Sequence, residues 1–254
     1  MGTTDKRMLP YASMGLLADP PPWNEHPAAQ PSRELGRSVL GNSISLFMPP
    51  GKSSPNTLVM GGVHGDESEA ILLAHLLLAR GCPAALIPCL NPDGALLRQR
   101  WNRNNVDLNR NLPAPDWSPE PLNPRYPPGP APASEPETQA FLKALEVLKP
   151  AAVVNLHSYK ESFLELERPA GEISERLNRA IDGFTEAAGI ERRLSIGYPT
   201  PGALGAFGLA NGLLVLTYEL ERGTSHHRVE ELAGPLTRLL EELEAERFAP
   251  LSTD

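Results

Sequence analysis

Short apolar segments alternate with longer segments of helical length along most of the chain. The apolar segments have the length and composition of buried strands and span residues 57–60, 84–90, 151–156 and 213–218. Residues 43–48 alternate apolar and polar side chains and predict the first strand. Helices are predicted over residues 69–80, 134–149, 171–188 and 229–248, the last broken or kinked near Pro235. This order of elements is typical of an α/β domain.

Two proline-rich segments lack any such pattern. Residues 20–31 predict an extended arm, and we expect the arm to cover residues 1–39 and a single domain to cover residues 40–254. Residues 112–133 contain nine prolines. A loop of this length inside a domain is usually disordered or functional, and we expect it to border the functional site. The helix that follows begins with a capping-box pattern in which Ser134 is the N-cap.

Composition and charge narrow the class of protein. The 254 residues fit one large α/β domain or two small ones, and the hydrophobic share of 41% supports a sizeable core. A net charge of −8 argues against nonspecific attraction to nucleic acid. No apolar stretch approaches the length of a membrane span. We therefore expect neither nucleic acid nor a membrane as a partner.

The cysteines and the N-terminal residues bear on the cellular compartment. Cys82 and Cys89 are expected to be free thiols in a reducing compartment rather than a disulfide framework. Residues 8–18, after Lys6 and Arg7, faintly resemble a signal peptide. Proline and polar residues interrupt this stretch, and no convincing cleavage site follows. We expect a cytoplasmic protein.

The segment MGGVHGDE at residues 60–67 follows a predicted strand and precedes a predicted helix. It places His64 and Glu67 three residues apart at the carboxyl end of a buried strand, where ligands gather in open α/β sheets. An imidazole and a carboxylate at such a turn suit a divalent metal, zinc above all. Taken alone, this pair is more often a capped helix start.

Two more candidate residues stand at the ends of predicted strands. Residues 151–156 run into His157, and residues 213–218 run into Glu219. If these strands lie parallel to the one before His64, all of these side chains reach the same sheet edge. Two histidines and one glutamate are a common ligand set of hydrolytic zinc. A core imidazole and a solvent-facing carboxylate explain each residue in isolation, but their joint occurrence favours a metal site.

Such a site has the groups that amide hydrolysis needs. Zinc held by His64, Glu67 and His157 would lower the pKa of a bound water from 15.7 towards about 7. A carboxylate that is not a metal ligand has to take the proton and pass it to the leaving nitrogen, and Glu219 is the candidate. A fixed cation near the metal would stabilise the oxyanion by roughly 3–4 kcal/mol.

Residues 98–111 supply cations in excess, because the segment holds four arginines and five asparagines. Arg100, Arg103 and Arg110 cannot all be buried without partners, so an electropositive, asparagine-lined pocket for a carboxylate is predicted. The alternative is a solvated basic loop that binds nothing. The segment lies between the predicted metal ligands along the chain, and this position favours a functional role.

These motifs, in this order, resemble the zinc metallocarboxypeptidase superfamily of carboxypeptidase A-like enzymes. HGDE at 64–67 is similar to the HxxE ligand pair, and HSY at 157–159 to the third ligand with its neighbours. YEL at 218–220 is similar to the strand that bears the general base, which implies this role for Glu219. The resemblance implies one catalytic zinc ion per chain.

The same resemblance implies roles in substrate binding. Arg100, in the segment Arg-Trp-Asn-Arg, stands where the family has its oxyanion arginine. Asn109 and Arg110, in Asp-Leu-Asn-Arg, are similar to the pair that binds the substrate's terminal carboxylate. Tyr198, followed by Pro-Thr-Pro-Gly, stands where the family has a mobile tyrosine that closes over the substrate.

The resemblance covers about residues 40–244 and includes the structural turn NPDG at 91–94. It implies an α/β/α sandwich around a mixed, mostly parallel eight-stranded sheet, in a single catalytic domain. Residues 35–38, 134–140 and 197–202 further resemble the murein peptide amidases. That likeness implies hydrolysis of the bond between γ-D-glutamate and meso-diaminopimelate in murein tripeptide, in the cytoplasm during cell-wall recycling.

One feature departs from what such a substrate requires. Residues 198–218 contain no charged side chain, yet the diaminopimelate side chain carries an ammonium and a carboxylate group. Its partners must then come from elsewhere. Asp116, Glu120 and Arg125 in the proline-rich loop are candidates, and solvated loop charges are the alternative interpretation.

Two other functions remain open at this point. N-acyl amino acid deacylases of the succinylglutamate desuccinylase type share the zinc ligands and the asparagine–arginine pair. The NPDG turn and the segment around Tyr198 favour the peptidase. A catalytically silent zinc or peptide-binding module is disfavoured, because neither a ligand nor the base is missing.

Overall fold

The computed structural model describes residues 33–168 and 173–246. Its strands are β1 (Arg33–Arg37), β2 (Ser43–Leu46), β3 (Thr57–Met60), β4 (Ala85–Ile87), β5 (Ala152–Tyr159), β6 (Phe163–Glu167), β7 (Glu191–Arg193) and β8 (Leu214–Glu221). Its helices are α1 (Ser68–Ala79), α2 (Pro92–Leu97), the 3-10 helix η3 (Leu108–Arg110), α3 (Pro136–Leu148), α4 (Glu175–Ala188), α5 (Leu204–Ala210) and α6 (His226–Ala245). None of these helices is long and apolar enough to cross a membrane.

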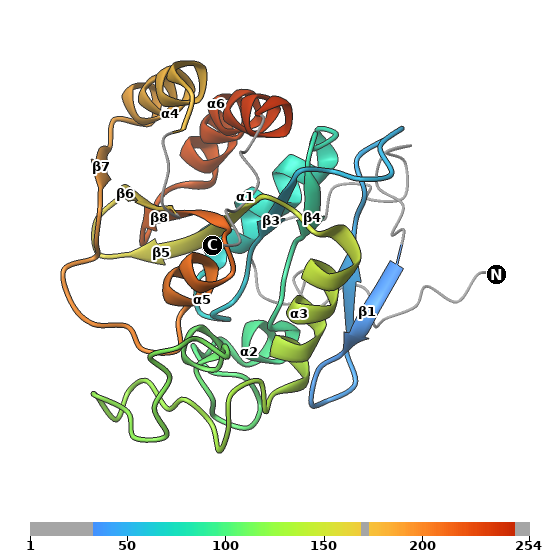
Figure 1. Cartoon of the computed structure of the whole chain (residues 1–254), viewed down its shortest axis with the longest axis vertical. Coiled ribbons are helices and arrows are strands. Elements are labelled where there is room, and N and C mark those ends of the chain that lie inside the picture. The colour runs from blue at the N-terminus through green and yellow to red at the C-terminus, as the bar shows by residue number, and fades with distance from the viewer. Residues whose placement is uncertain (1–32, 169–172, 247–254) are drawn as a thin grey trace, which may run out of the picture.

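A six-stranded sheet forms the middle layer, with the strand order β4-β3-β5-β8-β6-β7 (Figure 1). β4, β3, β5 and β8 run parallel, β6 runs antiparallel to β8, and β7 is parallel to β6. β1 and β2 form a separate antiparallel pair, which one bridge between Phe47 and Leu86 connects to β4. The predicted mixed, mostly parallel α/β fold is confirmed. The described strands, however, form sheets of six and two rather than one sheet of eight.

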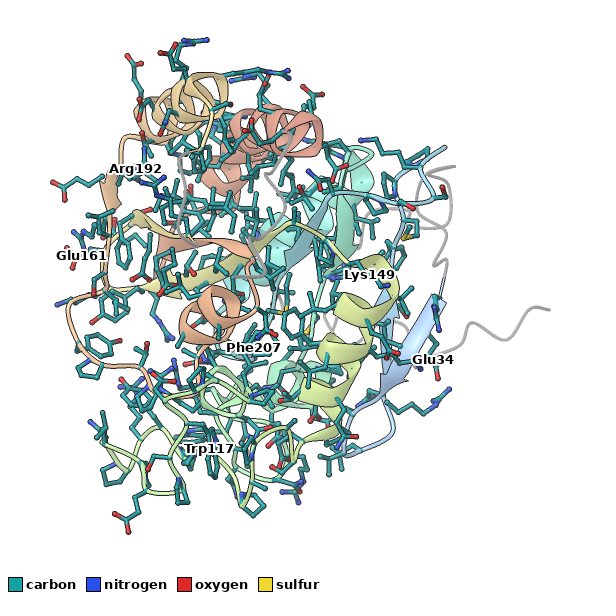
Figure 2. All side chains as sticks on the ribbon, viewed as in Figure 1. Glu34, Trp117, Lys149, Glu161, Arg192 and Phe207 are labelled. Atoms are coloured by element: carbon teal, nitrogen blue, oxygen red, sulfur yellow. The ribbon has the colours of Figure 1, made fainter. Side chains whose placement is uncertain are left out.

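Helices cover both faces of this sheet because its central strands bury side chains on both sides. Along β3, Leu58 joins the apolar cluster that includes α3 and α5, whereas Val59 joins the cluster that includes α1, α4 and α6. Figure 1 shows α1, α4 and α6 on one side of the sheet and α3 and α5 on the other. Phe207 of α5 lies inside, whereas Glu34 and Glu161 lie at the periphery (Figure 2).

Several helix boundaries differ from the prediction. Ser134 is not the N-cap of α3. Glu135 occupies that position without a side-chain cap bond, and the Ser134 hydroxyl donates to the Glu135 carboxylate. α4 begins at Glu175 with Ser174 as its cap, and residues 169–172 of the predicted helix lie outside the described part. α6 continues through Pro235 without a break.

The predicted N-terminal arm, residues 1–39, needs a correction at its end. Residues 33–37 form β1, and Leu35 is only 2% exposed because it packs in the cluster that includes α3. The Lys143 side chain also donates to the Leu35 carbonyl at 2.7 Å. These residues are therefore part of the folded domain, as is Ser38, which donates to Asp93 at 2.6 Å, whereas residues 1–32 lie outside the described residues.

Side chains of the asparagine-rich segment hold the proline-rich loop 112–133 beside the sheet edge. The Asn111 amide donates to the carbonyls of Pro128 and Ala131 at 2.8 and 3.0 Å. The Asp107 N–H donates to the Pro127 carbonyl at 2.8 Å. These bonds fix one end of the loop, so its residues have defined positions next to the candidate site.

The NPDG segment is the first turn of α2 rather than an isolated turn. The Asn91 side chain accepts from the Gly94 N–H at 2.8 Å and caps the helix. Asp93 is fully buried and accepts bonds from Ser38 and Asn42. Gly94 packs so tightly against Gly65, between the two HxxE residues, that a Cβ on Gly65 would overlap the Gly94 carbonyl group. The NPDG segment thus supports the HxxE turn from beneath.

We expect Gly65→Ala to destabilise the protein by at least about 2 kcal/mol, because neither backbone can move away without disturbing the other. The matched control is Gly183→Ala, which changes a residue inside α4 with open space around its Cβ position. That change should stabilise the protein by about 0.5–1 kcal/mol, because alanine favours the helix interior. Urea denaturation measures both. Equal stability of the two variants would contradict the close approach.

Candidate metal centre and active site

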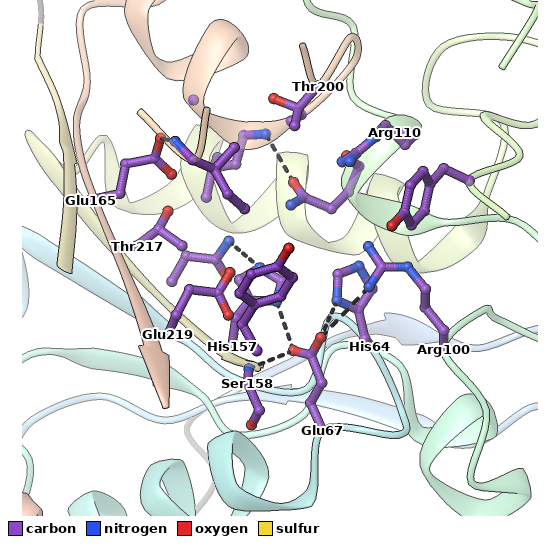
Figure 3. Close-up of a pocket in the computed structure, with 18 of the residues that line it drawn as sticks. His64, Glu67, Arg100, Arg110, His157, Ser158, Glu165, Thr200, Thr217 and Glu219 are labelled. Carbon is purple, nitrogen blue, oxygen red and sulfur yellow. Dashed lines mark hydrogen bonds and ion pairs between the residues drawn. The ribbon is translucent and has the colours of Figure 1, made fainter. Parts of the chain in front are cut away.

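The parallel register of β3, β5 and β8 brings the predicted site residues to one edge of the sheet. His157 on β5 pairs directly with Glu219 on β8. His64 and Glu67 follow β3 in the turn to α1. A cavity of about 400 Å³ opens at this edge (Figure 3). All eight predicted site residues line it: His64, Glu67, Arg100, Asn109, Arg110, His157, Tyr198 and Glu219.

His64, Glu67 and His157 converge as a candidate metal centre. One potential ligand atom from each residue lies within 4.8 Å of the other two. Nδ1 of His64 is 2.8 Å from Glu67 Oε1, and Nδ1 of His157 is 2.8 Å from Glu67 Oε2. Each of the three residues is 2% exposed. Two imidazoles and a carboxylate gathered in this way match the donor set of a hydrolytic zinc site.

Other side chains fix the far edge of each imidazole. His64 Nε2 lies 3.1 Å from Asp107 Oδ1, and His157 Nε2 lies 2.8 Å from the Asn155 amide. A histidine that donates its Nε2 hydrogen to such a partner keeps the Nδ1 lone pair for a metal ion. For His157 this tautomer requires the oxygen of the Asn155 amide to face the ring. The donor set and its supporting partners therefore fit zinc.

The buried charges of the centre compensate one another. Burial alone would raise the pKa of Glu67, but His64 and His157 outweigh it and hold this pKa well below its usual value. Burial and Arg100 lower the pKa of His64, yet Glu67 and Asp107 more than offset them, and the net shift is upward. Glu67 is therefore an ionised carboxylate, the form that binds a cation.

Glu219 lies beside His157, in the position of the candidate base (Figure 3). It is 7% exposed, and its Oε2 atom has no hydrogen-bond partner among the described residues. Burial raises the pKa of Glu219 to about 7. A carboxyl group that titrates near neutral pH can both accept a proton and return it.

Arg100 lies on the opposite side of the centre from Glu219 (Figure 3). Its Nε donates to Asp107 Oδ2 at 2.8 Å, and its Nη1 is 3.7 Å from Glu67 Oε1. Burial lowers the pKa of Arg100, but Asp107 and Glu67 outweigh this effect and raise it. The guanidinium group is thus a fixed cation at the metal centre.

Asn109, Arg110 and Tyr198 line the same cavity beyond Arg100. Arg110 is 5% exposed, and its guanidinium group lies 5.1 Å from the centre of the Tyr126 ring. Arg100 lies over the same ring, at 4.9 Å. The Asn109 Oδ1 atom accepts from the Leu204 N–H at 3.0 Å. Tyr126 therefore supports two guanidinium groups, which make this wall of the cavity cationic.

The prediction that residues 98–111 form an asparagine-lined pocket is wrong for most of these residues, because only Arg100, Asn109 and Arg110 line the cavity. Asn102 and Asn111 are fully buried and bind loop atoms, the former through the Asn104 and Val106 N–H groups. Arg103 is exposed and lies outside the cavity lining. Asparagine is favoured in this segment because its side-chain amide can bond to backbone N–H and C=O groups that have no backbone partner in an irregular loop.

Sequence reasoning missed two acidic residues of the site. Glu165 and Glu167 on β6 line the cavity together with Thr217 on β8. The alternating pattern Phe-Leu-Glu-Leu-Glu at 163–167 was an available signal, because it predicts a strand with both acids on one face. Residues 198–218 contain no charged side chain, as expected, and β6 instead supplies acidic side chains to the cavity lining.

The proline-rich loop contributes less than expected. Of the three candidate partners for the substrate side chain, Arg125 lines the cavity, whereas Asp116 and Glu120 do not. Asp116 instead accepts from the Gly202 N–H at 3.1 Å. Its carboxylate therefore supports the segment after Tyr198 rather than the cavity.

The fold and the site together define a metal-dependent hydrolase of the carboxypeptidase class. The zinc carboxypeptidase family matches the chain over residues 23–189. The chain belongs to this family, whose members use zinc. Tyr198 and Glu219 lie beyond the matched segment. Their assignment therefore depends on the cavity that they share with the metal centre.

The chain is also similar to individual members of that family. Murein peptide amidase A of Escherichia coli K12 is 31% identical over 91% of this chain and 93% of its own length, and the enzyme of that name from Vibrio campbellii is 27% identical over 81% and 86%. The crystal structure of murein-tripeptide amidase from E. coli O157 has a TM-score of 0.67 at 30% identity, covering 86% of this chain and 92% of that one. Carboxypeptidase A from Helicoverpa armigera has a TM-score of 0.66 at 16% identity, covering 84% and 68%, and shares the fold.

We expect the protein to bind one zinc ion per chain and Asp107→Asn to weaken zinc binding about 10–100-fold. The substitution replaces an oxygen that orients His64 or Arg100 with an amide NH2 group. Competition with a chelating dye measures the affinity. Asp182→Asn, the same change at an exposed position on α4, is the control and should leave zinc affinity unchanged. Full affinity in Asp107→Asn would contradict the orienting role.

Proposed function

We propose that this chain hydrolyses the amide bond that releases the C-terminal amino acid of a small peptide. One observation supports this proposal above all: a single cavity is lined by three kinds of group. They are the metal triad His64, Glu67 and His157, the buried carboxylate of Glu219, and the cationic pair Arg100 and Arg110. The metal-ligand candidates and Glu219 suit activation of water, and the arginines suit the two negatively charged groups of the reaction, the terminal carboxylate and the oxyanion.

Each of these residues has a role in the proposed mechanism. Arg110 and Asn109 bind the terminal carboxylate of the substrate, since a guanidinium group suits bidentate recognition. Arg100 stabilises the oxyanion with its fixed charge. Tyr198, 38% exposed at the cavity rim, covers the bound substrate. Burial raises the pKa of Tyr198 to about 12, so its hydroxyl keeps its proton.

Glu219 moves the proton in this mechanism. Its Oε2, which has no hydrogen-bond partner among the described residues, accepts a proton from the attacking water and returns it to the leaving nitrogen. When bound by His64, Glu67 and His157, zinc supplies Lewis acidity that polarises a carbonyl and acidifies water. Burial keeps the Glu219 carboxylate poorly solvated, which makes it a stronger base than an exposed glutamate.

The substrate that we propose is murein tripeptide, cut between γ-D-glutamate and meso-diaminopimelate during cell-wall recycling in the cytoplasm. Support comes from the likeness to proteins named murein peptide amidase A, which spans nearly the whole of both chains. The cavity volume of about 400 Å³ suits a small peptide. The described residues act in this proposal as a single catalytic domain.

We expect Glu219→Gln to lower kcat by about 10²–10⁴-fold while one zinc ion per chain still binds, because the amide cannot accept the proton. Glu221→Gln is the control, since this exposed residue lies on the same strand outside the cavity. Peptide hydrolysis followed by chromatography gives kcat. Near-wild-type turnover of Glu219→Gln would show that another group is the base.

The substrate class is tested by offering the zinc-loaded protein L-alanyl-γ-D-glutamyl-meso-diaminopimelate and N-acyl amino acids side by side. We expect free diaminopimelate and the dipeptide L-alanyl-γ-D-glutamate as products, identified by mass spectrometry. Faster hydrolysis of N-succinyl amino acids would favour a deacylase instead. Tripeptide binding without any product would indicate a binding module.

A further inference from the structure

The walls of the cavity carry opposite charges. Figure 3 shows Arg100 and Arg110 on one side and Glu165 and Glu219 on the other, with the metal triad between them. Glu219 is assigned to proton transfer, but that leaves the acidic residues of β6 without a role. Metal binding does not explain Glu165 or Glu167, because neither belongs to the triad.

The strand register places a row of polar side chains beneath the catalytic residues. Asn155, Thr217 and Glu165 are direct neighbours across β5, β8 and β6, so their side chains share one face of the sheet. All three line the cavity. This row lies two residues before His157 and Glu219 on β5 and β8, which corresponds to about 7 Å. It therefore forms the floor of the cavity next to the reacting bond.

Glu167 lies one row deeper, beside an apolar part of the same floor. Its neighbour on β8 is Val215, which is fully buried with Val153 on β5. Space for its carboxylate depends on Gly205 of α5, because a Cβ on Gly205 would overlap the carboxylate oxygens of Glu167. The fold thus leaves room for an acidic group at the end of the cavity.

The carboxylates of Glu165 and Glu167 lack a cationic partner among the described residues. Among the described residues, no lysine, arginine or histidine side-chain nitrogen forms an ion pair within 4.0 Å of a carboxylate oxygen of Glu165 or Glu167. Glu165 accepts a hydrogen bond from the Ile196 N–H at 2.7 Å. Burial raises the pKa of Glu167 to about 7, and the nearby carboxylates of Glu165 and Asp116 raise it further. A cationic ligand group would compensate both carboxylates.

We propose that Glu165 and Glu167 bind the ammonium group on the side chain of the leaving amino acid and so select a diamino acid. The inference rests on the proposed function, which sets the direction of the substrate. With the terminal carboxylate at Arg110 and the scissile amide at the metal centre, the side chain of the leaving residue extends along the floor. The row spacing of about 7 Å is within reach of the side chains of lysine and diaminopimelate.

Binding of free amino acids to the zinc-loaded protein isolates the ammonium group. L-Lysine and L-norleucine share their α-groups and differ in the terminal ammonium, and meso-diaminopimelate adds a carboxylate. We expect lysine and diaminopimelate to bind at least about 10-fold more tightly than norleucine, since bonds between charged groups are strong when partly buried. Isothermal titration calorimetry measures the affinities.

Charge-neutralising variants then assign the effect to β6. Glu165→Gln and Glu167→Gln should each reduce the preference for lysine over norleucine, and the double variant should abolish it. Norleucine affinity should stay unchanged, which shows that the cavity remains folded. Glu186→Gln, on an exposed position of α4, removes the same charge outside the cavity and should keep the full preference. Gly205→Ala, which displaces the Glu167 carboxylate, should act like Glu167→Gln.

Two binding results would overturn the inference: equal wild-type affinities for lysine and norleucine, or an unchanged preference in the double variant. Hydrolysis is followed in parallel with tripeptides that end in lysine or norleucine. If neither peptide is cleaved while free lysine is still preferred, the proposed reaction fails but the ammonium site stands. If both peptides are cleaved with equal kcat/KM, the reaction stands and the selecting role of Glu165 and Glu167 fails.

Discussion

The buried carboxylate of Glu67 is the constraint around which the site is organised. An ionised group that is 2% exposed has lost its hydration and needs compensation worth several kcal/mol. Both of its oxygens face imidazole Nδ1 atoms, of His64 and His157, at 2.8 Å. Arg100 and Arg222 approach it at 3.7 and 3.6 Å. A divalent cation compensates a buried carboxylate better than neutral imidazoles do, so the charge of Glu67 and the metal centre depend on each other.

How much of this arrangement the sequence reveals depends on the range of the interactions. The strand ends at His157 and Glu219 were predictable, because buried parallel strands are continuous apolar runs and parallel strands share an edge. The alternation that predicts β6 is equally local. It places Glu165 in the site, however, only once Glu165 is known to pair with Thr217. This antiparallel pairing joins segments that are distant in the sequence, so no periodicity along the chain predicts it.

The loops were the least predictable part for the same physical reason. The pattern Ser-Glu-Pro-Glu fits a capping box, but the Ser134 hydroxyl bonds to Asn111 and Glu135 instead. Asn111 in turn bonds to carbonyls of the proline-rich loop. A hydroxyl has several partners of similar strength within reach, and tertiary contacts decide among them. Local propensity therefore located α3 while misassigning its cap.

The acidic residues of β6 also depend on a small residue in α5. The space beside the floor is shared between β6 and α5, and only one of them can fill it. Here α5 contributes Gly205, which has no side chain, and β6 contributes Glu167, whose carboxylate occupies the volume. A larger residue at position 205 would occupy this volume and exclude the Glu167 carboxylate. The uncharged segment 198–218 and the acidic strand β6 are thus connected, because Gly205 in that segment leaves the space that the Glu167 carboxylate occupies.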